Sequence, residues 1–244
     1  MIPKIIHYCW FGRNPLPKSA KKFIASWKKF LPDYEIKEWN EDNFDVNIIP
    51  YTRDAYQAKK YAFVSDYARF WILYHYGGVY FDTDVEVVKS LDTLLEDGAF
   101  MGWETPSADG AYKIAPGLGL AAPTHFPLYK EILNGFEKLD FHLANGCINP
   151  YSMIPMVTDI LSQKGLLMDG TTQKVADVMI YAPSYFCPMN AVSGQVLITS
   201  NTYTIHWYTM SWLPKHRQWR VKFMRVLRRL FSSVISFKKY QWNH

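Results

Sequence analysis

Two aspartates, Asp82 and Asp84, stand directly after a short apolar run at 79–81 and are separated by one residue. A run of this kind predicts a buried strand. Because residues i and i+2 of an extended segment point to the same side, we expect both carboxylates to face one ligand. Carboxylate oxygens suit Mg²⁺ or Mn²⁺, which take further ligands from water and substrate phosphates. A polar turn without a ligand is the alternative interpretation.

The segment in front of this pair must position it. Apolar residues at helical spacing predict a helix over 62–76, and Gly77-Gly78 can end it in the left-handed conformation. Asp66 and Arg69 are i,i+3 neighbours on one edge of that helix. As a surface ion pair they would contribute only about 0.3 kcal/mol. Next to a metal site they could instead bind a substrate.

The combination Ser65-Asp66-x-x-Arg69, Gly77-Gly78 and Asp82-x-Asp84 resembles the signature of glycosyltransferase family 32, which includes bacterial capsule enzymes. The resemblance extends to the first residues, IPKIIHYCW, and to the region around His206. It implies an α/β fold of the GT-A type, a Rossmann-like nucleotide-diphospho-sugar transferase fold. In such a fold we expect a single mixed, mostly parallel sheet flanked by helices.

The resemblance also implies roles for individual residues. The expected metal ligands, for Mn²⁺ or Mg²⁺, are Asp82, Asp84 and His206. The expected catalytic residues are Asp84, Asp66 and Arg69. The expected donor-binding residues are Trp10, Ser65, Asp66, Arg69, Tyr80, Asp82, Ser211 and Trp212, with Trp10 stacking on the nucleotide base. From the residues alone, Trp10 could equally belong to the core and His206 could be structural.

The activity implied by this resemblance is sugar transfer with retention of configuration. The donor would be a nucleoside-diphosphate sugar, a UDP-sugar first of all, and the acceptor a lipid-linked saccharide in capsule or lipopolysaccharide synthesis. The sequence also fits two other classes. One is an aspartyl-phosphate phosphohydrolase that uses the same Asp-x-Asp, although no acidic residue follows Asp177 to complete its usual downstream metal pair. The other is a catalytically silent carbohydrate- or membrane-binding protein.

Composition and order along the chain favour one globular α/β domain. The chain has 244 residues, 49% of them hydrophobic, which suffices for a single core. Its three cysteines are scattered, which indicates reduced thiols in a cytosolic protein. Nothing at the N-terminus resembles a signal peptide. Strands are predicted at 2–10, 34–39, 100–103, 114–122 and 203–207, and a strand followed by a turn at 178–188. Further helices are predicted at 19–30, 51–60, 127–138 and 153–163.

The C-terminal segment 214–244 is predicted to be a separate basic helical tail behind a transferase domain at 1–213. From Lys215 onward the chain has nine Lys/Arg and no acid, so the residues before it are net acidic. Apolar residues at helical spacing, among them Trp219 and Phe223, give the tail a second, apolar face. This pattern is typical of an interfacial helix on an anionic membrane. We therefore expect a cytoplasmic protein on the inner face of the plasma membrane. Nucleic acid is not expected as a partner, since it offers nothing to the apolar face. A helix packed on its own domain is the alternative.

Overall fold

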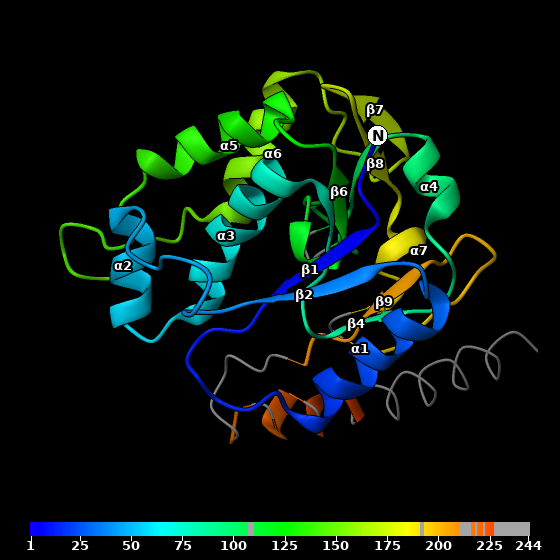
Figure 1. The fold of residues 1–244 in the computed structure, drawn as a ribbon, viewed down its shortest axis with the longest axis horizontal. Coiled ribbons are helices and arrows are strands. Elements are labelled where there is room, and N and C mark those ends of the chain that lie inside the picture. Colours follow the sequence, from blue (N-terminus) through cyan, green and yellow to red (C-terminus); the bar gives the residue numbers. More distant parts are fainter. Residues whose placement is uncertain (107–109, 191–192, 210–215, 218, 222, 227–244) are drawn as a thin grey trace, which may run out of the picture.

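The computed structural model describes residues 1–106, 110–190, 193–209, 216–217, 219–221 and 223–226 (Figure 1). Ser211 and Trp212, two of the expected donor-binding residues, lie outside these described residues. Within them, a seven-stranded sheet has the order β2-β1-β3-β6-β5-β8-β7. Its strands are β1 (Ile5–Cys9), β2 (Glu35–Trp39), β3 (Gly78–Tyr80), β5 (Ala99–Gly102), β6 (Leu120–Ala122), β7 (Gln173–Val175) and β8 (Val178–Tyr181).

The strands of this sheet run mostly in one direction. β1 pairs in parallel with β2 and β3, and β5 pairs in parallel with β8. β6 is antiparallel to both β3 and β5, and β7 is antiparallel to β8. Only β6 and β7 therefore oppose the others in this sheet. The predicted α/β class, with a mixed and mostly parallel sheet, is confirmed.

Helices cover both faces of the sheet, because its central strands are apolar on both sides. Ile6 and Val79 face one core, while Cys9 and Tyr80 face the other. The second core also contains side chains of α2, α3, α5 and α6, and the first contains side chains of α1, α4 and α7. The helices are α1 (Lys18–Phe30), α2 (Pro50–Gln57), α3 (Tyr61–Tyr76), α4 (Asp92–Glu96), α5 (Pro127–Glu137), α6 (Met153–Gln163), α7 (Pro183–Phe186) and the 3-10 turn η1 (Pro116–Leu118). In the part of the chain that the structure describes, no helix is both long and apolar enough to cross a membrane.

A second, two-stranded sheet lies beside the main one and was not predicted. β4 (Val85–Val87) pairs antiparallel with β9 (Thr204–His206), which comes more than a hundred residues later. α1 packs against it, and the indole N–H of Trp27 donates a hydrogen bond to the carbonyl of Val85 at 2.8 Å. This small sheet joins the end of the described domain to the segment that follows the aspartate pair.

The turn between α3 and β3 needs glycine at both positions. Gly77 has φ +63° and Gly78 has φ +101°, conformations that L side chains rarely adopt. A Cβ at Gly78 would also lie 2.6 Å from the carbonyl oxygen of Ile5 on β1. The predicted glycine stop is therefore confirmed. It allows the carboxyl end of α3 to turn directly into the centre of the sheet.

His7 on β1 is an interior histidine that holds this turn. Its Nε2 lies 3.0 Å from the carbonyl oxygen of Gly77, and its Nδ1 accepts a hydrogen bond from the indole of Trp39 at 3.0 Å. Both ring nitrogens are thus satisfied in the neutral form. Burial lowers the pKa of His7 to about 4, because it disfavours the cation.

We predict that His7 makes the protein less stable in mild acid. The pKa of His7 is lower in the folded state than its ordinary value of 6.5. Its contribution is therefore complete above pH 6.5 and is lost as the pH falls toward 4, by roughly 2 kcal/mol at pH 5. Urea unfolding at pH 7 and pH 5 should show a smaller difference for His7→Gln than for the wild type. The exposed control His142→Gln should keep the wild-type difference; equal differences in all three proteins would contradict this role.

Candidate functional site

The aspartate pair leaves the sheet at the edge where the parallel strands end. His7 on β1 pairs with Tyr80 on β3, so Trp10 and Asp82 follow neighbouring strands at the same edge. In open α/β sheets, ligands bind beyond these carboxyl ends. The two carboxylates come together by a different route from the extended one expected. Asp82 to Val85 form a turn, in which the Val85 N–H donates to the Asp82 carbonyl at 3.1 Å.

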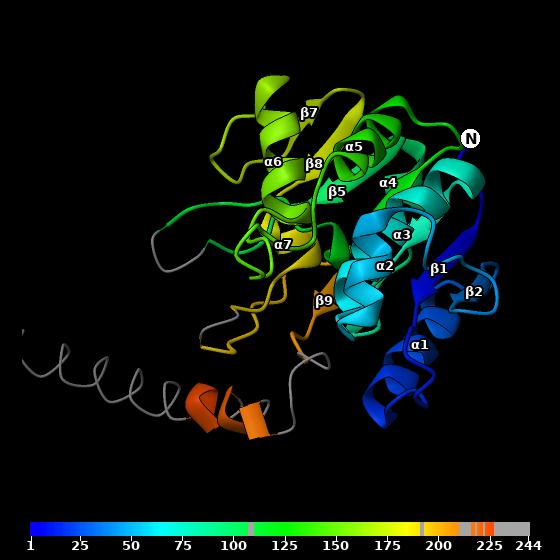
Figure 2. The same cartoon turned by 90° about the vertical axis from the view of Figure 1, so that its left-hand side faces the viewer.

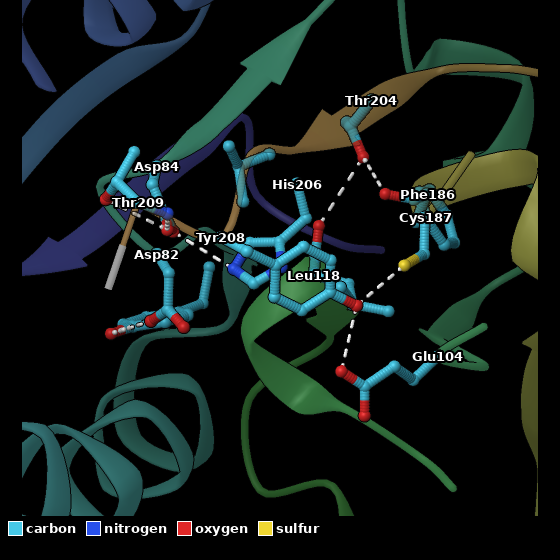
Figure 3. Close-up of polar contacts among 12 residues, drawn as sticks. Asp82, Asp84, Glu104, Leu118, Phe186, Cys187, Thr204, His206, Tyr208 and Thr209 are labelled. Carbon is cyan, nitrogen blue, oxygen red and sulfur yellow. Dashed lines mark hydrogen bonds and ion pairs between the residues drawn. The ribbon is translucent and has the colours of Figure 1, made fainter. Parts of the chain in front are cut away.

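Asp84 is fixed by the segment around β9. Its Oδ1 lies 3.0 Å from Nε2 of His206, and its Oδ2 accepts hydrogen bonds from the backbone N–H and the hydroxyl of Thr209 at 2.8 and 3.2 Å (Figure 3). The pairing of Val85 with His206 in the small sheet sets this geometry. It places a late histidine against the aspartate pair.

Asp82, Asp84 and His206 each offer a ligand atom, and these atoms all lie within 4.8 Å of one another. Oxygen and imidazole ligands at this spacing are a candidate site for a divalent cation. The Nδ1 atom of His206 is buried and has no hydrogen-bond partner, and so is Nη1 of Arg69 nearby. Buried polar atoms without partners are rare in native proteins. The residues therefore fit a bound ion with a polar ligand, and the structure brings the three expected metal ligands together. Their role as ligands stays a prediction.

The two carboxylates differ in their electrostatics. Burial acts to raise the pKa of Asp84, but the His206 side chain and the hydrogen bonds from Thr209 outweigh it and hold the pKa at about 2. Burial raises the pKa of Asp82, although Arg69 opposes the shift. Burial acts to lower the pKa of His206, but Asp84 outweighs it and raises the pKa. Asp84 is thus the carboxylate that stays ionised most firmly.

Arg69 on α3 neutralises the other side of the pair. Its side chain is 3% exposed and lies 3.0 Å from Asp66 and 3.2 Å from Asp82. The Tyr80 hydroxyl also donates to Asp82 at 3.2 Å, and the Arg69 guanidinium lies over the Tyr80 ring. The alternative of an exposed surface ion pair is therefore wrong, since the helix turns this edge toward the strand ends. Burial raises the pKa of Asp66 to about 6.

The remaining expected donor-binding residues, where the structure describes them, make their hydrogen bonds away from the Asp82–Asp84 pair. The Ser65 hydroxyl donates to the carbonyl of Tyr61 within α3 at 3.2 Å, so it stabilises the helix. Trp10 is only partly buried, and its indole donates to the Asn14 carbonyl at 2.5 Å. Trp10 is therefore not a fully enclosed core residue. Its role in base stacking stays a prediction, and Ser211 and Trp212 remain outside the described residues.

Gly117 in η1 allows this arrangement to form. Its carbonyl accepts the Asp82 N–H at 3.2 Å. A Cβ at this position would overlap Oδ2 of Asp82 and lie 3.1 Å from Nη1 of Arg69. The turn must therefore carry a glycine where its backbone approaches the carboxylate. Nothing in the sequence marks Gly117 as part of the site, because only the folded chain brings η1 next to β3.

Tyr208 and Glu104 are further residues of the site that were not predicted from the sequence. The Tyr208 hydroxyl lies 2.8 Å from Oε1 of Glu104 and 2.9 Å from Sγ of Cys187, and its ring lies 4.2 Å from the His206 ring (Figure 3). Tyr208 has φ +46°, which is strained for a bulky side chain. Its position two residues after His206 was a visible signal, whereas nothing in the sequence links it to Glu104.

The geometry can be compared with known proteins. Residues 17–101 match the family model "Glycosyltransferase sugar-binding region containing DXD motif". This sugar-binding region includes α3, β3 and the Asp82–Asp84 pair, and it ends before β9. The sequence prediction of an Asp-x-Asp glycosyltransferase region is thereby confirmed, while the bacterial capsule or lipopolysaccharide type is not established.

Two fungal proteins are similar in sequence. Over 113 residues the chain is 34% identical to inositol phosphoceramide mannosyltransferase 3 of Schizosaccharomyces pombe, covering 43% of this chain and 31% of that protein. It is 25% identical over 241 residues to mannosyl phosphorylinositol ceramide synthase SUR1 of Saccharomyces cerevisiae, covering 97% of this chain and 56% of that one. The chain thus spans about a third to a half of the length of these relatives.

Among solved structures, the chain is similar to PaToxG glycosyltransferase, with 19% identity, a TM-score of 0.48 and coverage of 67% of this chain and 70% of that chain. It is also similar to a glycosyltransferase involved in the glycosylation of the major capsid of PBCV-1. That likeness has 13% identity, a TM-score of 0.47 and coverage of 90% of this chain and 100% of that chain.

We predict that Tyr208→Phe weakens metal binding without unfolding the protein. The substitution removes the hydroxyl that joins Glu104 to the segment carrying His206. Loss of a group that orients a metal ligand typically costs on the order of tenfold in affinity. Titration of Mn²⁺ by electron paramagnetic resonance should show this loss. Tyr185→Phe, in a half-buried tyrosine elsewhere, should bind Mn²⁺ like the wild type, and unchanged affinity in Tyr208→Phe would exclude the orienting role.

Proposed function

We propose that this chain is a metal-dependent glycosyltransferase of the GT-A type. In this proposal a sugar passes from a nucleoside-diphosphate sugar, a UDP-sugar first of all, to a saccharide acceptor with retention of configuration. The observation that carries the proposal is the grouping of Asp82, Asp84 and His206 at the strand ends, next to the buried Arg69. The match of residues 17–101 to a glycosyltransferase sugar-binding region supports it.

In the proposed reaction, one group of residues contacts the diphosphate of the donor and another contacts its sugar. Asp84, Asp82 and His206 would hold Mn²⁺, or Mg²⁺, against the diphosphate. The ion would supply Lewis-acid neutralisation of the charge that develops on the leaving oxygen. Such electrostatic stabilisation can amount to several kcal/mol when the charged groups are fixed beforehand.

Side chains of α3 would bind the sugar of the donor. Arg69 is held by Asp66 and Asp82, and its Nη1 atom has no protein partner, so it can donate to a sugar hydroxyl. Asp66 can accept from another hydroxyl. Trp10 would provide a ring for the nucleotide base at the same edge of the sheet. Because ion pairs already hold Arg69 and Asp66 in place, these two side chains would need little ordering in the transition state.

An aspartyl-phosphate phosphohydrolase is the less favoured assignment. Such an enzyme requires a free carboxylate as nucleophile on the first aspartate. Here Oδ1 of Asp82 is engaged by both Arg69 and Tyr80. This pairing would have to break before Asp82 could attack a phosphate.

We also propose a lipid-linked acceptor and a location on the inner face of the plasma membrane. The Schizosaccharomyces pombe relative is named as a mannosyltransferase of inositol phosphoceramide, and the Saccharomyces cerevisiae relative as a synthase of mannosyl phosphorylinositol ceramide; both names refer to lipids. In the described tail residues, which are helical, Trp219 is 70% exposed and Phe223 is 49% exposed, and their rings stack at 5.8 Å. These exposures favour an interfacial tail over one packed on its own domain. We keep 1–213 as the transferase domain and 214–244 as the tail, and capsule or lipopolysaccharide synthesis as the expected context.

The donor site can be tested by thermal unfolding. Mn²⁺ with UDP at about 100 times the dissociation constant should raise the Tm by roughly 5 °C or more. Asp84→Asn should abolish this increase, because it removes the carboxylate that stays most firmly ionised. The exposed control Asp140→Asn should retain it. A panel of UDP- and GDP-sugars, scored for metal-dependent slow hydrolysis, then identifies the donor. Release of phosphate from a simple phosphomonoester, without donor hydrolysis, would favour the phosphohydrolase instead.

The membrane proposal can be tested with flotation of the full chain on anionic vesicles. Trp219→Ser with Phe223→Ser should reduce binding by tenfold or more, since both apolar side chains would otherwise enter the lipid interface. Leu197 and Ile198 are equally exposed apolar residues outside the tail. Their double substitution by Ser should leave binding unchanged. Equal binding by all three proteins would contradict attachment to the membrane through the tail.

A further inference from the structure

Five of the seven exposed residues of α1 are lysines. α1 runs from Lys18 to Phe30 and contains no acidic residue. At about 100° per residue, six of its positions fall within an arc of about 120°. These positions are Lys18, Lys21, Lys22, Ala25, Lys28 and Lys29, and all six are exposed. We call the five lysines the lysine stripe.

The opposite side of α1 packs against the rest of the domain. Phe23 and Trp27 are buried, and the Trp27 indole donates to the Val85 carbonyl in the small sheet. The Phe23 ring also stacks on Trp207, directly after His206. α1 is therefore held firmly by its apolar side, and the lysine stripe plays no part in holding it. The stripe is a fixed surface that α1 presents outward.

The stripe is not there for the stability of the helix. Lys18, Lys21 and Lys22 lie near the amino end, where positive charge opposes the helix dipole. They are also like-charged i,i+3 and i,i+4 neighbours, which destabilises a helix. Among the ion pairs of the described residues, none includes a lysine of the stripe. Lys28 and Lys29 do suit the carboxyl end, so the first three lysines are the ones that need another explanation.

We propose that the lysine stripe is a second contact surface for anionic lipid, separate from the tail. A row of positive charges that form no ion pair among the described residues complements a negatively charged leaflet, and each such residue strengthens attachment. In both Figure 1 and Figure 2, the amino end of α1 and the described helix of the tail lie at the lower end of the molecule. Figure 2 shows the two at opposite sides of this lower end, so they would touch a surface at separate points.

Two contacts orient a protein on a surface, whereas one only tethers it. The carboxyl end of β1 also points toward this lower end in Figure 1, so the stripe would hold the edge of the sheet that carries Asp82 near the lipid. This orientation gives a lipid-linked acceptor a short path to the donor, and that part rests on the proposed function. The contact with lipid itself stands on the charge of α1 alone.

The test compares two triple variants of the full chain with equal net charge. In the stripe variant, Lys18, Lys21 and Lys22 are each changed to Gln. In the control variant, Lys130, Lys138 and Lys174 are each changed to Gln. These three lysines are exposed and lie on or next to α5 and on β7, at the upper end of Figure 1. Circular dichroism confirms that both variants fold.

Binding is measured by co-sedimentation with phosphatidylcholine vesicles that contain about one third phosphatidylglycerol, where surface charge dominates attachment. We expect the stripe variant to bind at least about tenfold more weakly than the wild type, and the control variant to bind like the wild type. Equal losses in both variants would show a dependence on net charge only and would overturn the proposal. No loss in either variant would overturn it too.

Two further measurements distinguish lipid binding by the stripe from nucleic-acid binding and from the proposed transferase activity. If the stripe variant binds vesicles normally but loses binding to an RNA homopolymer, the partner is nucleic acid and the proposal fails. Metal-dependent donor hydrolysis in vesicle-free buffer should be unchanged in the stripe variant, because no lysine of the stripe belongs to the donor site. If no protein hydrolyses any donor while the vesicle result holds, the proposed function fails and the lipid contact stands.

Discussion

Two half-buried carboxylates next to one another are the constraint around which this structure is built. Asp82 and Asp84 repel each other, and each lies in a part of the protein where charge is costly. Arg69 compensates from α3, and His206 compensates from β9. Each carboxylate therefore depends on a different element of the fold. Their ligand atoms and that of His206 stay within 4.8 Å of one another, a spacing that one divalent cation can bridge.

This arrangement explains the less regular parts of the fold. The glycine turn after α3 folds β3 back along the helix, so that Asp82 after β3 meets Arg69 in the middle of α3. The small sheet brings the last described strand back to the aspartate pair. Tyr208 accepts a strained backbone and anchors this returning segment to Glu104. The segment that carries His206 is thus held on both sides of the histidine.

The sequence was sufficient for the local features of the site and not for its long-range contacts. Helical spacing and paired glycines identified α3 and its end, and the apolar run identified β3. The pairing of Asp66 with Arg69 followed from their spacing alone, but its burial did not, because burial depends on how α3 packs on the sheet. The backbone from Asp82 to Asp84 was expected to be extended but forms a turn. The Asp-x-Asp spacing is the same in both conformations, so the sequence does not distinguish them. Glu104 and Gly117 reach the site only through the order of strands in the sheet, and periodicity carries no such information.

The proposed activity requires that a divalent cation binds between Asp82, Asp84 and His206. Crystals grown with Mn²⁺ and UDP, measured at a wavelength where manganese scatters anomalously, test this requirement most directly. We predict one strong anomalous peak in contact with Asp84 and with the diphosphate, and its disappearance in Asp84→Asn crystals. A structure with bound UDP and no peak among these three side chains would contradict the central claim.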